Sequence, residues 1–76
     1  MRGAIGDQFK REFDECIEWL RENPQTPPKI FQDARGKTLR RFPYKIIYRV
    51  EGKLINVLTV VHTARKDKIW QKEVRG

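Results

Sequence analysis

Residues 44–61 hold the pattern that most restricts the fold of this chain, two strand-like runs joined by a tight turn. The run "YKIIYRV" alternates between two faces of a strand, with Tyr44, Ile46, Tyr48 and Val50 on one and Lys45, Ile47 and Arg49 on the other. In the turn "EGK", Gly52 can adopt the positive φ that such hairpins require. The second run, "LINVLTVV", is apolar at nearly every position, which predicts a central strand covered on both faces.

The segment before the hairpin predicts one amphipathic helix over residues 6–22. Its apolar side chains recur at steps of three and four residues, and they are Phe9, Phe13, Cys16, Ile17 and Leu20. Asp7 is the expected N-cap, and Asn23-Pro24 should end the helix. Trp19 lies off the centre of the apolar stripe, so we expect it at a rim. The proline-rich "NPQTPPK" that follows predicts a stiff, extended connector.

The remaining segments complete a small α+β domain over residues 1–76. "IFQDARG" should lead into the sheet with a turn at Arg35-Gly36, "KTLRRF" should form a short strand, and Pro43 should lie at a bend. The tail "ARKDKIWQKEV" predicts a short basic C-terminal helix. The expected fold is therefore an amphipathic helix packed on a small antiparallel sheet of about three strands. One helix covers only one sheet face, so we expect an exposed apolar surface that serves either self-association or an obligate partner.

The net charge of +7 is unevenly distributed along the chain. Residues 1–28 hold six acidic and four basic side chains, whereas residues 29–76 hold four acidic and thirteen basic ones. Five arginines lie on or beside predicted strands, namely Arg35, Arg40, Arg41, Arg49 and Arg65. This asymmetry indicates an anionic partner, either nucleic acid or an acidic protein segment.

Several classes of function lack their usual motifs in this sequence. It has no Ser/His/Asp arrangement at recognisable spacing, no clustered carboxylates for two-metal catalysis and no Gly-rich phosphate loop. Cys16 is the single cysteine, which excludes an internal disulfide, and we expect neither a metal site nor a cofactor. No apolar run is long enough to cross a bilayer, and no secretory signal opens the chain, so we expect a cytoplasmic protein without membrane contact.

The stretch "LRRFPYKIIYRVEGKLINVLTVVHTARKDKIW" resembles the C-terminal half of the RelE/ParE toxin superfamily, the plasmid-stabilisation proteins. The shared pattern is arginine–Phe-Pro-Tyr, an apolar pair, Tyr-Arg-Val, an acidic-glycine turn and an apolar strand that ends in His-x-x-Arg. "GDQFKREFDECIEWLRENP" is similar to the second helix of that family. Family members usually begin with a strand and a first helix, where this chain has only "MRGAI", so the resemblance implies an N-terminally shortened member.

The resemblance implies the toxin component of a type II toxin–antitoxin module and leaves three activities open. A RelE-like toxin cuts ribosome-bound messenger RNA without a metal, using the 2′-hydroxyl of the RNA as nucleophile. A ParE-like toxin inhibits DNA gyrase and needs no catalytic residues. A remnant would only bind its antitoxin, an acidic and partly disordered protein. Whether the protein is an enzyme therefore stays undecided at this point.

For RNA cleavage, the candidate catalytic residues are Lys45, His62, Arg65 and Lys66, which could bind phosphate or transfer protons. Arg40, Arg41, Arg49 and Trp70 are candidates for binding nucleic acid or antitoxin. Two positions depart from the RelE-like pattern. Lys45 stands where RelE-like toxins often carry an arginine, and Trp70 stands near the position where they carry a catalytic tyrosine. We expect the cationic side chains after the prolines to converge into a single concave pocket.

Overall fold

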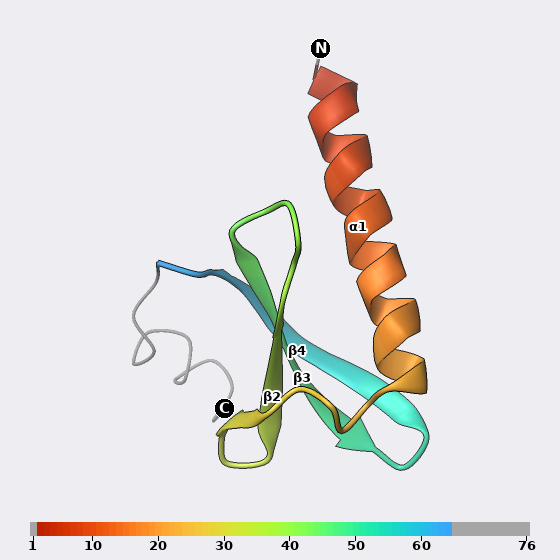
Figure 1. The fold of residues 1–76 in the computed structure, drawn as a ribbon, viewed down its shortest axis with the longest axis vertical. Coiled ribbons are helices and arrows are strands. Elements are labelled where there is room, and N and C mark those ends of the chain that lie inside the picture. Colours follow the sequence, from red (N-terminus) through yellow and green to blue (C-terminus); the bar gives the residue numbers. More distant parts are fainter. Residues whose placement is uncertain (1, 65–76) are drawn as a thin grey trace.

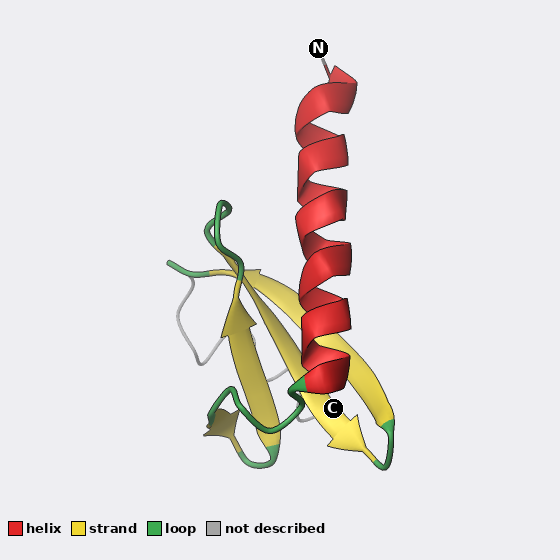
Figure 2. Ribbon diagram, turned by 45° about the vertical axis from the view of Figure 1, so that its right-hand side comes forward, coloured by secondary structure: helices red, strands yellow, loops and turns green. Residues whose placement is uncertain are grey.

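The computed structural model describes the backbone of residues 2–64 and the side chains of residues 6–64. Its elements are α1 (Arg2–Glu22), β1 (Lys29–Phe31), β2 (Ala34–Thr38), β3 (Tyr44–Glu51) and β4 (Leu54–His62). The strands form one antiparallel sheet in the order β1-β2-β3-β4. Helix α1 lies against one face of this twisted sheet, and its first turns extend past the sheet (Figure 1; Figure 2). The α+β architecture is confirmed, with four strands in place of about three. The predicted C-terminal helix lies outside the described residues.

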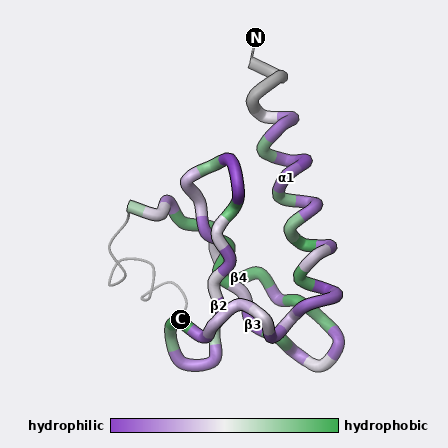
Figure 3. The backbone as a smooth tube through the Cα atoms, in the orientation of Figure 1, coloured by the Kyte–Doolittle hydropathy of each residue, from purple (hydrophilic) through white to green (hydrophobic). Residues whose placement is uncertain are grey.

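Helix α1 buries the predicted stripe but begins earlier than predicted. Leu20 is fully buried, and Phe9, Phe13, Cys16 and Ile17 pack beside it against the sheet. Apolar and polar stretches alternate along α1 in Figure 3. The helix begins at Arg2, so the prediction of an N-cap at Asp7 is wrong. Gly6, the residue directly before Asp7, costs the helix only about 1 kcal/mol, which is too little to force a boundary there.

The C-terminal end of α1 is where the sequence predicted it. The helix ends at Glu22, and both the backbone N–H and the side-chain amide of Asn23 donate to the Trp19 carbonyl, at 2.9 and 3.0 Å. The connector that follows is held by Arg35, whose Nη1 donates to the carbonyls of Gln25 at 3.1 Å and Pro27 at 2.6 Å. The hydroxyl of Tyr48 donates to the Pro24 carbonyl at 2.8 Å. Two side chains of the sheet thus fix the path of the prolines.

The β3–β4 hairpin forms as predicted, with Gly52 at φ +63° in the turn. Its register shifts between Ile47, which faces Thr59, and Tyr48, which faces Val57, so that Leu58 has no direct partner. The prediction that residues 54–61 form a central strand is wrong, because β4 is the last strand of the described sheet. Its apolar residues pack on both faces of the sheet, which explains why nearly every position of the run is apolar. Val61 is the one buried residue of β4.

The start of the sheet also differs from the sequence prediction. Arg35 and Gly36 lie within β2, and the turn falls at Gln32 and Asp33, with Gln32 at φ 53°. Gly36 leaves space for two side chains, since a Cβ there would lie 2.7 Å from Ile30 Cδ1 and 3.0 Å from Lys45 Cδ. Of the predicted strand "KTLRRF", only Lys37 and Thr38 belong to β2. Pro43 lies in the bend before β3, as predicted.

Two hydrophobic clusters lie on opposite faces of the sheet. The cluster under α1 has four buried members, Leu20, Leu39, Ile46 and Tyr48. The cluster on the far face has three, Ala34, Ile47 and Val61, with Ile30, Phe31 and Leu58 packed against them. The far face therefore buries apolar side chains that we expected to be exposed.

The large apolar side chains that stay exposed among the described residues are Trp19 and Val57, each at 36%, and Leu54 at 71%. The rim position predicted for Trp19 is confirmed. Within the same residues, no helix combines the length and the apolar character needed to cross a membrane.

Candidate functional site

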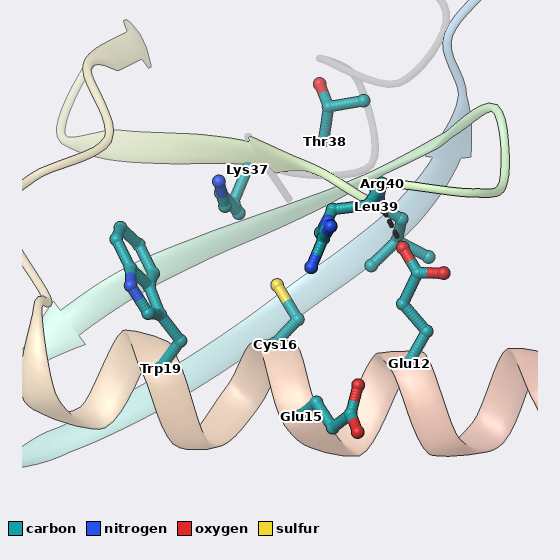
Figure 4. Close-up of a pocket in the computed structure, with 8 residues that line it drawn as sticks. All are labelled: Glu12, Glu15, Cys16, Trp19, Lys37, Thr38, Leu39 and Arg40. Atoms are coloured by element: carbon teal, nitrogen blue, oxygen red, sulfur yellow. Dashed lines mark hydrogen bonds between the residues drawn. The ribbon is translucent and has the colours of Figure 1, made fainter.

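A groove runs between α1 and β2 and continues beside the loop that follows β2. Its larger part has a volume of about 300 Å³ and is lined by Glu12, Glu15, Cys16, Trp19, Lys37, Thr38, Leu39 and Arg40 (Figure 4). A neighbouring hollow of about 210 Å³ shares Glu12, Glu15 and Arg40 and adds Gln8, Arg11 and Arg41. We refer to both parts together as the α1–β2 groove.

Glu12 connects the two walls of the α1–β2 groove. Its Oε2 accepts a hydrogen bond from the backbone N–H of Arg40 and a second, at 2.9 Å, from that of Arg41. Its Oε1 is buried and has no hydrogen-bond partner among the described residues. Because the carboxylate holds the two backbone amides, the guanidinium groups of Arg40 and Arg41 are left exposed at the groove.

The opposite end of the groove is built by Trp19, Lys37 and Cys16. Lys37 Nζ lies 4.7 Å from the centroid of the Trp19 ring, a distance at which the cation is attracted to the π face. Burial raises the pKa of the Cys16 thiol, while the nearby Lys37 charge acts to lower it. The net rise keeps the thiol protonated near neutral pH, so Cys16 acts here as a small apolar side chain and not as a nucleophile.

His62 lies at the end of β4, directly opposite Tyr44 in the sheet register. The two rings meet edge to face at 5.3 Å, and the His62 Nδ1 accepts a hydrogen bond from the Ala64 N–H at 3.1 Å. The imidazole is exposed on the helix side of the sheet, at the end away from the connector. In the neutral ring, this arrangement leaves the proton on Nε2.

Lys45 and Arg49 lie on the other face of the sheet. Lys45 faces Val61 in the register and packs beside Gly36 and Ile30. Arg49 pairs with Asp33, with 2.9 Å between Nε and Oδ1. Glu51, two residues after Arg49, accepts a hydrogen bond from the Asn56 side chain at 2.9 Å.

The prediction that the cationic side chains converge into one pocket is wrong for the described residues. Arg40 and Arg41 meet at the α1–β2 groove, His62 lies at the end of β4, and Lys45 and Arg49 lie on the far face. Alternation along β3 sends Lys45 and Arg49 away from the helix, because Tyr44, Ile46 and Tyr48 face it. The other three candidates, Arg65, Lys66 and Trp70, lie outside the described residues.

The groove also contains residues that the sequence analysis did not select. The available signal for Glu12 was its place in the helix: it lies three residues after Phe9 and four before Cys16, which puts an acidic side chain beside the apolar stripe. Lys37 and Arg11 join it only through tertiary contacts. In residues 6–64, no three His, Cys, Asp or Glu side chains come together as metal ligands would.

Comparison with known proteins gives one result. The family model of the ParE toxin of type II toxin–antitoxin systems (parDE) matches residues 2–67. Comparison with curated proteins found no match, and comparison with solved structures found none either. The matched range covers α1, the whole sheet and the His-x-x-Arg segment that carried the sequence resemblance. This chain therefore belongs to the ParE toxin family of type II toxin–antitoxin systems.

Proposed function

We propose that this toxin acts on DNA gyrase through protein contacts and does not cleave RNA. The observation that carries the proposal is the separation of Lys45 and His62 by the sheet, together with the family to which the chain belongs. The resemblance implies that ParE-like toxins stall gyrase on DNA without nuclease activity. Gyrase is a cytoplasmic target, and we propose the cytoplasm as the compartment of action.

The placement of the candidate catalytic groups supports a non-catalytic toxin. Cleavage by the 2′-hydroxyl of RNA needs a proton acceptor, a proton donor and cationic groups within reach of one phosphodiester. His62 faces the helix side beside Tyr44, whereas the Lys45 side chain packs against Gly36 on the far side. A single phosphate cannot contact both side chains across a hydrogen-bonded sheet.

Gyrase-dependent DNA breakage tests the proposal. The purified protein, incubated with gyrase, ATP and supercoiled plasmid, should give linear DNA after the gyrase is denatured, and none when gyrase is omitted. His62→Ala should keep this activity, since a protein-contact mechanism needs no proton transfer by the imidazole. Breakage that is lost in His62→Ala, or that is absent with the wild type, would contradict the proposal.

Metal-free cleavage of ribosome-bound messenger RNA is the second candidate function. One observation favours it: the His62 imidazole is exposed and presents Nε2 away from its hydrogen bond to Ala64. In that mechanism His62 transfers a proton, and Arg65 and Lys66, carried over from the resemblance, bind the phosphate. Message cleavage that survives a chelator and disappears in both His62→Ala and Arg65→Ala would select this activity over gyrase inhibition.

The partner that controls either activity is an antitoxin, as the family implies. We propose that it is acidic, because thirteen of the seventeen basic side chains fall in residues 29–76, and that it is partly disordered, as the resemblance implies. If gyrase and ribosome assays are both negative while the antitoxin binds tightly, antitoxin binding is the remaining function.

A further inference from the structure

We propose that two copies of this chain pair through the outer edge of β4, with the two strands antiparallel and a two-fold axis at Asn56. The pairing joins the two described sheets into one continuous sheet and places both copies of α1 on the same side of it. This association is independent of the toxin activity proposed above.

The backbone of β4 presents hydrogen-bonding groups at its outer edge. A two-residue turn closes the β3–β4 hairpin, so Glu51 and Leu54 face each other, as the closing hydrogen-bonded pair of such a hairpin does. Bonding to β3 then alternates along β4, so that Asn56 directs its backbone groups to β3, whereas Ile55 and Val57 direct theirs outward. No strand of the described residues pairs with this edge, since β4 is the last strand in the sheet order.

A two-fold axis at Asn56 gives a register that suits both strands. Ile55 of one copy then faces Val57 of the partner subunit, so two residues with outward-directed backbone groups exchange their hydrogen bonds. Ile55 and Val57 face Val50 and Tyr48 of β3, on the helix side of the sheet, so apolar side chains meet across the new pair. A shift of one residue would set the side chains of the two strands on opposite faces.

The half of β4 next to the turn is the exposed half. Leu54, Asn56 and Val57 are exposed, whereas Leu58 is half-buried and Val61 is buried. The register also shifts at Leu58, and such a bulge interrupts regular pairing with a further strand. In the proposed register Leu54, which is 71% exposed, contacts Leu58 of the partner subunit, so the pairing covers the most exposed of the large apolar side chains described.

The absence of charge on β4 favours a second copy as the occupant of this edge. The chain has a net charge of +7, yet β4 carries no Asp, Glu, Lys or Arg, and the other three described strands each carry at least one of them. Edge strands that stay unpaired usually carry a lysine or a proline, and β4 has neither. An acidic peptide or a nucleic acid would find no cationic side chain on β4, whereas a second β4 brings no like charges together.

A disulfide at the two-fold axis tests the register. In Asn56→Cys, made together with Cys16→Ala, the two introduced thiols occupy a non-hydrogen-bonded pair, where Cα atoms lie about 4.5 Å apart, within reach of a disulfide. The control is Lys53→Cys, also made with Cys16→Ala, whose thiols lie about 20 Å apart in the same pairing. Mild oxidation should give a covalent dimer from Asn56→Cys and only monomer from Lys53→Cys on non-reducing gels. Equal amounts of dimer from the two variants, or no dimer from Asn56→Cys, would overturn the proposal.

Amide exchange of the unmodified protein tests the same edge without any substitution. NMR on the ¹⁵N-labelled protein should show the Ile55 and Val57 amides exchanging about tenfold more slowly once about nine-tenths of the chains are paired, since only the free edge exchanges. The amide of Thr38 in β2, on the other side of β3, should keep its rate as the protein concentration rises. Rates at Ile55 and Val57 that do not depend on concentration would overturn the proposal. Slowing there that requires added DNA or an added acidic peptide would assign the edge to another occupant and would also overturn it.

Discussion

Glu12 is the side chain that fixes the loop after β2 to the helix, because one carboxylate oxygen accepts from the amides of both Arg40 and Arg41. Truncation to alanine leaves both amides without this partner. We expect Glu12→Ala to lower the free energy of unfolding by about 1–3 kcal/mol, measured by urea denaturation. Glu12→Gln keeps an accepting oxygen and loses only the charge, so its loss should be about half as large.

The matched control for this prediction is Glu15→Ala, since Glu15 lies three residues further along α1 and lines the same groove. Glu15 is exposed and forms no hydrogen bond or ion pair with the described residues, so its removal should change stability by about 0.5 kcal/mol or less. A loss in Glu15→Ala equal to that in Glu12→Ala would show that helix charge, and not the two amide bonds, stabilises the loop.

Tyr48 is fully buried, and its hydroxyl donates to the Pro24 carbonyl at 2.8 Å. Tyr48→Phe should lower the free energy of unfolding at neutral pH by about 1–2 kcal/mol, through loss of this hydrogen bond. Tyr44→Phe is the control, since its hydroxyl has no hydrogen bond to another described residue. Similar losses in the two variants would contradict the role of the bond.

The pH dependence of Tyr48 gives a separate prediction. Burial raises the pKa of the Tyr48 phenol above its ordinary value of 10.0. The unfolded chain therefore releases this proton first, and the wild type loses stability as the pH rises above 10. Tyr48→Phe lacks this titration, so the stability gap between the two proteins should narrow in chemical denaturation above pH 10. A gap that widens there would show that the folded state favours the charged phenolate.

At the scale of elements, aromatic side chains join α1 to the β2–β3 connection. The Phe9 ring lies 5.2 Å from Phe42, 5.5 Å from Tyr44 and 6.4 Å from Phe13, measured between ring centroids. These contacts hold the part of the helix that extends beyond the strands.

Phe9→Ala should lower the free energy of unfolding by about 1–3 kcal/mol and speed amide exchange in the first half of α1. Lys10→Ala removes only an exposed ion pair to Asp14 and should cost about 0.5 kcal/mol or less. Unchanged exchange in Phe9→Ala would mean that the N-terminal turns of α1 are held by other contacts.

The elements differ in how far the sequence predicted them. The β3–β4 hairpin and the end of α1 follow from local patterns, the alternation around Gly52 and the Asn23-Pro24 stop. The prediction of a turn at Arg35-Gly36 was wrong because a glycine can mark either a turn or a close approach of neighbouring strands. Gly36 makes room for Ile30 and Lys45 inside a strand, and only the neighbouring strands reveal that close approach.

At the scale of the whole molecule, β4 offers a surface for self-association at the edge of the described sheet, and not over the sheet face that the sequence predicted to be uncovered. Leu54 and Val57 are exposed, β4 carries no Asp, Glu, Lys or Arg, and no described strand pairs with its outer edge. We expect concentration-dependent association in analytical ultracentrifugation, and we expect Val57→Lys to reduce it.

Thr26→Lys adds the same charge in the exposed connector and should leave the association unchanged. A monodisperse wild-type monomer that binds no apolar dye would contradict the prediction. Equal effects of the two lysine substitutions would assign the change to net charge and not to β4.

The sequence by itself determined the hairpin, the apolar face of α1, the excess of positive charge after residue 28 and the family, because each depends on local spacing or on residues in a continuous stretch. Only the tertiary structure decided which cations come together. Strand alternation sends Lys45 and Arg49 to the far face, while Glu12 draws Arg40 and Arg41 toward the helix. A charge count fixes the sign of the field but not its direction, since direction depends on the face each strand presents and on contacts between residues distant in the chain.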